Sequence, residues 1–148
     1  MWLSLNFCTQ VVSTLAMLGL IWFVQLVHYP LFLRADPATF AAFEAEHARR
    51  VTGIAGPLMC LELGTALLGL LPGLRPAVVS GHEALLGAAL VAFLWASTIF
   101  VQIPAHNRLH RGYNAHTLHQ LIRGNWLRTI AWTLRGALIT FWLHRLVL

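Results

Sequence analysis

The hydrophobic positions of this chain fall into four long runs, separated by three shorter polar or turn-forming stretches. No charged residue occurs in residues 1–33, and a helix needs about 20 apolar residues to cross a bilayer. Further apolar runs cover residues 51–71 and 84–104, and a fourth begins near Asn125 and continues to the C-terminus. The pattern predicts an all-α protein, an integral membrane four-helix bundle that forms a single domain over residues 1–148.

Local signals refine the expected boundaries. Asp36 and Pro37 are typical of a helix N-cap followed by proline, so residues 40–50 are expected to be an amphipathic helical lead-in to the second span. Residues 105–124 are expected to form a polar connection, and no internal repeat is evident. Small residues four apart in the third run predict a close helix–helix approach at Ala88, Ala92 and Ala96.

Composition places the chain in the membrane class. It is 58% hydrophobic and 10% charged, with a mean hydropathy of +0.69, whereas soluble domains carry about 25% charged residues. The net charge is +5 and every basic side chain is arginine. Because these arginines flank apolar runs and do not form a patch with interleaved aromatics, we expect the lipid bilayer as partner and no nucleic acid.

The distribution of arginines predicts the orientation. Seven arginines flank the first and third connections, and two lie on the opposite side. The seven are Arg34, Arg49, Arg50, Arg108, Arg111, Arg123 and Arg128, and the two are Arg75 and Arg145. Positive charge favours the cytoplasmic side, so the expected location is the bacterial inner membrane, with both termini periplasmic.

Four antiparallel spans bring polar residues from distant parts of the chain to one end. The end of the first span, the start of the second, the end of the third and the start of the fourth all meet there. The polar residues at these places are His28, Glu44, His47, His106, Asn107, His110, Asn125 and Arg128. The topology therefore predicts a polar pocket that opens toward the cytoplasmic leaflet.

Two further charges are expected inside the hydrocarbon region. Glu62 lies twelve residues beyond Arg50, and Arg135 lies seven beyond Arg128. A charge in the membrane interior costs at least about 2.5–3.5 kcal/mol and is usually paired. We therefore predict that Glu62 and Arg135 lie close together, either as a pair that fixes helix register or as part of a cavity or proton path.

A metal site is one candidate chemistry. Glu44 and His47 share a helix face at a spacing of three, a unit that carboxylate-bridged metal bundles use. With five acidic residues in the chain, the full di-iron pattern cannot be completed. A single copper, iron or zinc ion held by His28, His47 and His106, with Glu44 as a further ligand, remains open, as does a protein without cofactor. A heme would need an axial histidine inside the membrane, for which His28 fits best and His106 is the second candidate.

Two motifs carry a family resemblance. The run PAHNRL at residues 104–109 and the run NWLRT at residues 125–129 resemble the small four-helix membrane proteins typified by the anthrone oxygenases. The resemblance implies an oxygenase-like membrane enzyme that acts on flat phenolic substrates with dioxygen. It also implies that Asn107, Asn125 and Arg128 are site residues. A looser similarity, carried by His28 and by Arg49 with Arg50, is to bacterial heme-binding four-helix protoporphyrinogen oxidases.

The functional hypothesis is a small membrane oxidoreductase that acts on a lipophilic aromatic or quinone-like molecule. The expected catalytic residues are His28, His47, His106, Arg128, Asn125 and Glu62. The expected substrate-binding residues are Asn107, Gln102, Arg135 and Trp126. The alternatives are a heme-binding oxidase and a non-enzymatic transport or partner subunit, and a homo-oligomer stays open.

Overall fold

The computed structural model describes residues 2–148, with side chains from Leu5 onward. Over that range the chain forms four helical rods and no strand, which confirms the all-α bundle. The first rod is α1 (Trp2–Phe23), a π-helix η1 (Val24–His28) and α2 (Tyr29–Phe32), and the second is α3 (Phe40–Leu68). The third rod is α4 (Gly81–Ser97), a π-helix η3 (Thr98–Gln102) and α5 (Ile103–Leu109), and the fourth is α6 (Ala115–Val147). A 3-10 helix, η2 (Pro72–Leu74), lies between α3 and α4.

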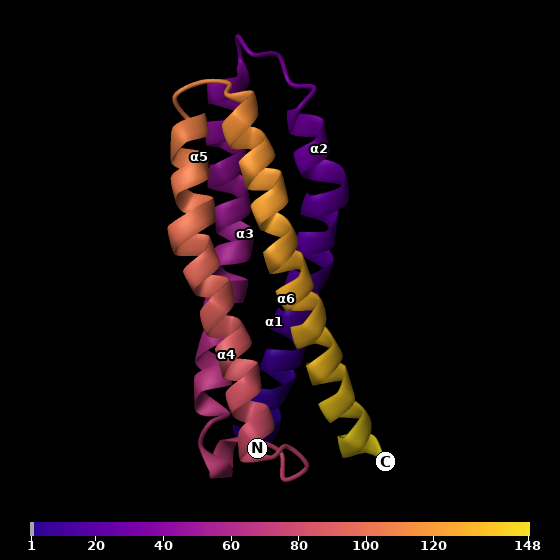
Figure 1. The fold of residues 1–148 in the computed structure, drawn as a ribbon. Coiled ribbons are helices and arrows are strands. Elements are labelled where there is room, and N and C mark those ends of the chain that lie inside the picture. Colours follow the sequence, from indigo (N-terminus) through magenta and orange to yellow (C-terminus); the bar gives the residue numbers. More distant parts are fainter. Residues whose placement is uncertain (1) are drawn as a thin grey trace.

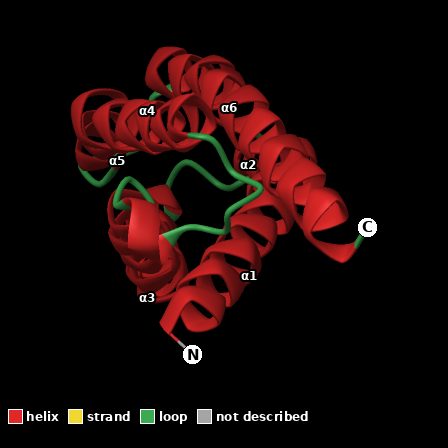
Figure 2. Cartoon of the chain, turned by 90° about the horizontal axis from the view of Figure 1, so that it is seen from below, coloured by secondary structure: helices red, strands yellow, loops and turns green. Residues whose placement is uncertain are grey.

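The rods run antiparallel along one another (Figure 1). The connections from α2 to α3 and from α5 to α6 lie together at one end, and both termini lie at the other end. Figure 2, which looks along the bundle from the terminal end, shows the helices arranged around a common centre. We call the two ends the connection end and the terminal end. The polar residues expected to converge all lie toward the connection end.

The outer surface of the bundle is apolar. Large side chains such as Val12, Ile54, Leu85 and Ile130 are each more than half exposed on outward faces. Three helices of the described chain are long and apolar enough to cross a membrane: Leu5–Phe32, Phe40–Leu68 and Gly81–Leu109. These are the surface and the helix lengths of a protein surrounded by lipid.

Helix α6 is more polar than these three because it carries arginines on its inward face. Arg128 is 8% exposed and Arg135 is 0% exposed, so both charges face the other helices and not the surroundings. Helix α6 packs along α1, α4 and α5, and from Trp126 onward it exposes large apolar side chains such as Leu127, Ile130, Leu134 and Phe141. That α6 is the fourth span remains a prediction, supported by this packing.

Two expected boundaries are wrong. Helix α6 begins at Ala115, ten residues before Asn125, and Asn114 caps it by accepting a hydrogen bond from the Thr117 N–H at 2.8 Å. The polar connection is therefore short, and most of residues 105–124 are helical. Asp36 is not the N-cap of the second helix, because it caps a turn through the Ala38 N–H at 3.0 Å; α3 begins at Phe40, so residues 40–50 are helical as expected.

The expected contact stripe in the third rod is also wrong. Ala92 and Ala96 are exposed. The buried row of α4 is the adjacent one: Ala84, Gly87, Val91, Leu94 and Ser97. In this row Gly87 allows the closest approach, since a Cβ there would collide with the Arg135 guanidinium of α6.

Candidate metal centre

A carboxylate and two imidazoles meet inside the connection end of the bundle. One ligand atom from each of Glu44, His47 and His106 lies within 4.8 Å of the others. Glu44 is 0% exposed, and its Oε1 accepts a short hydrogen bond from His106 Nδ1. His110 Nε2 lies 3.9 Å from the same oxygen. We call Glu44, His47 and His106 the Glu–His–His cluster.

Two helices supply the cluster. Helix α3 presents Glu44 and His47 one turn apart on its buried face, as their spacing of three requires. Helix α5 presents His106 from the other hairpin. The antiparallel topology therefore joins residues about 60 positions apart in the sequence, as the hydrogen bond across 62 positions between Glu44 and His106 shows.

His28 lies beside the cluster and shares a hydrogen bond with one of its members, His47. Its Nε2 is 2.7 Å from His47 Nδ1, and it is only partly buried, at the end of η1. The group of mutually close ligand atoms does not include His28. Of the four predicted metal ligands, the structure thus brings three together and places His28 as a hydrogen-bonding neighbour of His47.

Aromatic side chains enclose the cluster. The hydroxyl of Tyr29, a residue 3% exposed, lies 3.2 Å from His106 Nε2. The Phe32 ring packs edge-on against His28 and His47 at centroid distances of 4.9 and 4.8 Å. Sequence reasoning missed Tyr29, although it directly follows His28. Its hydrogen bond and the packed rings fix the orientation of the imidazoles.

The donor set fits a transition metal. Two imidazoles and one carboxylate, with remaining positions free, is the pattern of non-heme iron oxygenases, and imidazole ligands also suit copper and zinc. The second carboxylate oxygen of Glu44 is buried and has no hydrogen-bond partner within residues 5–148. A buried carboxylate oxygen left without a partner is unfavourable, and a bound cation would remove that cost.

A layer of polar side chains lies deeper in the bundle than the cluster. Asn125 Nδ2 donates to Gln25 Oε1 at 2.8 Å, and Arg128 donates to Asn125 Oδ1 at 3.1 Å. Gln102 is 2% exposed, and its side-chain amide has no partner in the part of the chain that the structure describes. These four residues, Gln25, Gln102, Asn125 and Arg128, form the amide–arginine layer.

Sequence reasoning missed Gln25, and one signal could have found it. The triplet Phe-Val-Gln occurs at residues 23–25 and again at 100–102, near the same end of the first and third rods. The first copy overlaps the start of the π-helix η1, and the second forms the end of the π-helix η3. Both glutamines are buried. π-Helical segments are frequent at functional sites. The recurring triplet is therefore a short sequence signal that marks the amide–arginine layer.

The predicted pair of Glu62 and Arg135 is confirmed. Arg135 Nε lies 3.6 Å from Glu62 Oε1, and both side chains are buried. Glu62 also accepts hydrogen bonds from Thr14 Oγ1 at 2.7 Å and from Trp132 Nε1 at 3.0 Å. Glu62 follows His47 on α3 by 15 residues, which is about 22 Å along a helix axis. The pair is therefore a separate polar layer and does not contact the Glu–His–His cluster.

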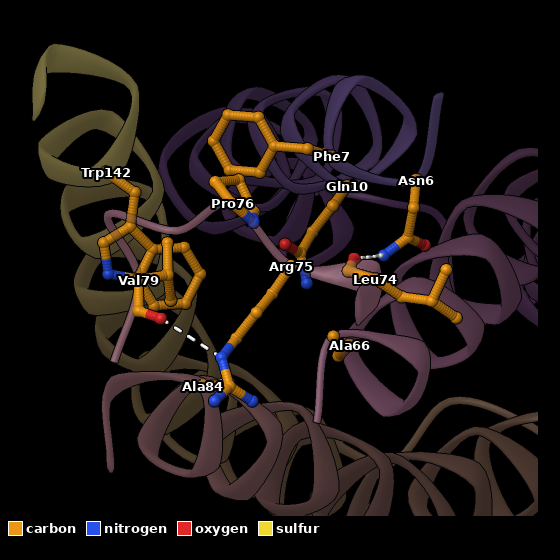
Figure 3. A pocket seen from close by; sticks show the side chains of 11 residues that line it. Asn6, Phe7, Gln10, Ala66, Leu74, Arg75, Pro76, Val79, Ala84 and Trp142 are labelled. Atoms are coloured by element: carbon orange, nitrogen blue, oxygen red, sulfur yellow. Dashed lines mark hydrogen bonds between the residues drawn. The ribbon is translucent and has the colours of Figure 1, made fainter. Parts of the chain in front are cut away.

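The bundle is closed at its terminal end. There Asn6 donates to the Leu74 carbonyl at 3.0 Å, and Arg75 donates to the Val79 carbonyl at 3.1 Å (Figure 3). Gln10 and Trp142 line the same small pocket from α1 and α6. The connection that contains η2 thus covers this end, and the larger open space lies at the connection end.

Two predicted substrate residues lie away from the interior. Asn107 is exposed on α5, on the face opposite to the buried Ala105 and Leu109. Trp126 is 40% exposed and packs edge-on against Trp22 at 5.9 Å. Neither side chain belongs to the cluster or to the amide–arginine layer, and their role in substrate binding stays a prediction.

Comparisons of the chain with protein-family models, with curated proteins and with solved structures gave no match. The resemblance to the anthrone oxygenases therefore rests on the two sequence motifs. Of the residues in those motifs, the structure brings Asn125 and Arg128 into the interior and leaves Asn107 outside.

Proposed function

We propose that this chain is a membrane oxidoreductase in which Glu44, His47 and His106 bind one transition metal ion. The substrate is a lipophilic phenolic or quinone-like molecule, and dioxygen is the oxidant. The observation that carries the proposal is the convergence of the three ligand atoms to within 4.8 Å, from two helices, at a buried position. The bound ion would supply the redox chemistry at that position.

The surroundings of the cluster support a resident ion. Ligating histidines usually bond through their second ring nitrogen to a neighbour that fixes their orientation. His47 has His28 as such a neighbour at 2.7 Å, and His106 has Tyr29 at 3.2 Å. Among the candidate metals, iron is favoured because its oxygenases use two histidines and one carboxylate.

The amide–arginine layer supports an oxygen-containing substrate. Gln102 and Arg128 offer N–H groups that find no partner among the described side chains, and both residues are more than nine-tenths buried. Arginine at a buried site is suited to bind a phenolate or carboxylate oxygen. The lipid-facing surface of the bundle makes lipophilic molecules the accessible substrates.

The orientation belongs to the same proposal. Since Arg128 is buried, six exposed arginines remain at the connection end: Arg34, Arg49, Arg50, Arg108, Arg111 and Arg123. Arg75 and Arg145 lie at the terminal end. This bias favours a cytoplasmic connection end, with both termini periplasmic in a bacterial inner membrane.

A heme held by His28 and His106 is less favoured. Both imidazoles already pair with other side chains, His28 with His47 and His106 with Glu44 and Tyr29. A Soret band in the purified protein would reverse this preference.

A non-enzymatic transport role is the second candidate. One observation favours it: buried polar groups continue beyond the cluster toward the terminal end, at Gln10, Ser13, Thr14, Glu62 and Arg135. Proton flux into liposomes that contain the purified chain, abolished by Glu62→Gln, would support transport. Absence of flux together with substrate-dependent oxygen consumption would support the enzyme.

The direct experiment is metal analysis of the detergent-purified protein. Cells are grown with iron, copper or zinc in separate cultures, and metal per chain is measured. We expect about one ion per chain in the wild type, since residues 5–148 contain one such donor set. Glu44→Gln and His106→Ala are each expected to lower metal affinity at least about 100-fold, because outer-shell changes alone cost 10–100-fold.

The matched controls are His82→Ala and His119→Ala, which change exposed histidines away from the cluster. They are expected to retain the ion. Oxygen consumption with a long-chain alkylhydroquinone then tests the reaction class. Wild-type protein that binds no ion, or Glu44 and His106 variants that bind as well as the controls, would contradict the proposal.

A further inference from the structure

An open groove lies beside the Glu–His–His cluster. Its residues belong to α2, the connection of residues 33–39 and the start of α3. Figure 1 shows these segments at the connection end of the bundle. The volume of the groove is about 490 Å³, within the range of about 300–1,000 Å³ that small-molecule sites occupy. His28 lines this groove, and the hydrogen bond from His28 to His47 joins the groove to the cluster.

The groove has apolar walls that face lipid. Leu31, Phe32, Ala35 and Phe43 line it. Leu31 is 52% exposed and Phe43 is 44% exposed, so the mouth of the groove opens on the apolar surface of the bundle. A molecule dissolved in the bilayer could therefore reach His28 without crossing an aqueous phase, and its flat rings would pack against the exposed Phe43 side chain.

The polar rim of the groove carries two charged side chains, Arg34 and Asp36. Asp36 lines the rim, but its carboxylate accepts the Ala38 N–H at 3.0 Å and so caps the turn. Arg34 also lines the rim, is exposed, and forms no ion pair with any residue that the structure describes. A guanidinium at the lipid–water boundary is suited to hold an anionic oxygen while the rest of the ligand stays in the apolar groove.

We infer that this groove is the lateral access route and the outer binding site of the phenolic or quinone-like substrate, and that this substrate enters from the bilayer carrying an acidic group on its aromatic ring. Its rings lie against the exposed side chains of Leu31 and Phe43, and its carboxylate or other anionic oxygen lies at Arg34. The inference deepens the proposed oxidoreductase function. It rests on that function only in identifying the bound molecule as the substrate. The binding itself requires no metal.

Photolabelling tests the inference. The probe is benzophenone-4-carboxylate, an aromatic acid that forms covalent bonds with nearby C–H groups on illumination, and uncharged benzophenone is the comparison. The purified chain is labelled in bilayer nanodiscs and the labelled peptides are identified by mass spectrometry. We expect label from benzophenone-4-carboxylate to concentrate in residues 28–43 of the wild type.

Two pairs of variants make the test specific. Ala35→Trp fills the groove, and Ala77→Trp adds the same ring to the exposed connection at the terminal end. Labelling of residues 28–43 is expected to fall about tenfold in Ala35→Trp only. Leu31→Trp, at an exposed lining position, replaces Ala35→Trp if that variant does not fold.

Arg34→Gln and Arg123→Gln form the second pair, since both arginines are exposed at the connection end. Arg34→Gln is expected to weaken labelling by the carboxylate about tenfold, the factor for one charge-assisted hydrogen bond, and to leave benzophenone labelling unchanged. Arg123→Gln is expected to change neither.

Three results would overturn the inference. The first is label spread equally over the apolar faces of the helices. The second is labelling insensitive to Ala35→Trp and Leu31→Trp, and the third is retention of a co-purified phospholipid in the groove that the probe does not displace. Metal content is measured on the same samples. Specific labelling of a chain that binds no metal would refute the oxidoreductase proposal alone, and unspecific labelling of a metal-loaded chain would refute the groove alone.

Discussion

The pair of Glu62 and Arg135 offers a sharp test of how charge is held inside this bundle. Glu62→Gln keeps the size of the side chain but removes the negative charge that faces the guanidinium at 3.6 Å. Glu62 is 1% exposed and Arg135 is 0% exposed, so water does not replace the lost partner. Thr14 and Trp132 donate to different oxygens of Glu62, so the single glutamine oxygen can keep the hydrogen bond from Trp132, while the Thr14 hydroxyl can accept one from the new amide N–H.

The expected cost follows from the burial of the pair. Removing one partner of a buried ion pair typically costs about 3–5 kcal/mol, because the other charge stays buried without compensation. Glu62→Gln and Arg135→Met are each expected to lower the free energy of unfolding by that amount. The double variant, which leaves no unpaired charge, is expected to lose no more than either single variant.

The assay is reversible unfolding of the purified chain in mixed micelles, followed by circular dichroism. The matched control is the pair Glu46→Gln and Arg49→Gln on the surface of α3, where the side chains are 44% and 71% exposed. Each of these changes is expected to cost less than about 1 kcal/mol. Single interior variants that cost as little as the controls, or a double variant that equals the sum of its singles, would refute the reasoning.

Three other variants probe the packing and the polar layers. Gly87→Ala would push a methyl group into the Arg135 guanidinium and is expected to cost about 1–3 kcal/mol in the same assay, whereas Gly64→Ala, which meets nothing within 4 Å, is expected to be neutral or stabilising. Gln25→Leu leaves a buried amide of α6 without its acceptor and is expected to cost about 1–3 kcal/mol; no loss of stability would show that the amide finds another partner. Tyr29→Phe removes a hydrogen bond to a cluster imidazole and is expected to weaken metal affinity about 10–100-fold, measured by competition with a chromogenic chelator; equal affinity would argue against an orienting role.

Much of the site could be predicted from the sequence because topology alone determines it. Four antiparallel helices of spanning length must bring His28, Glu44, His47 and His106 to one end, whatever their side-chain packing. The spacing of three between Glu44 and His47 also fixes a shared helix face. The proximity of Glu62 and Arg135 could be predicted because an unpaired charge in the membrane interior costs free energy.

The residues that could not be predicted lie at and beyond the π-helices. The buried positions of the third rod follow ordinary helical steps from Gly87 to Ser97, but the next buried position is Gln102, five residues later. A regular helix would have turned Val101 inward, and Val101 is exposed. A π-helix rotates every following side chain, and helical periodicity alone does not show where one occurs. Asn107 lies five positions after Gln102; it was expected to face the interior of the bundle and is exposed.

Helix α6 misled the sequence reasoning for another reason. Its first turns carry exposed His116 and His119, so they look like a polar loop although they are helical. Arg128 was counted among the charges that flank the membrane, yet it is buried against Trp132, with its guanidinium carbon 5.0 Å from the ring centre. Hydropathy cannot distinguish a solvent-facing arginine from one that faces the helices.

The claim on which the account depends is that Glu44, His47 and His106 together bind one transition metal ion. X-ray absorption spectroscopy at the metal edge, on protein purified in detergent from iron-supplemented cells, tests it most directly. We predict a first shell of nitrogen and oxygen only, with the multiple-scattering pattern of two imidazoles, lost in His106→Ala and retained in His82→Ala. A first shell of water oxygens without imidazole scattering, or the same spectrum in both variants, would contradict it.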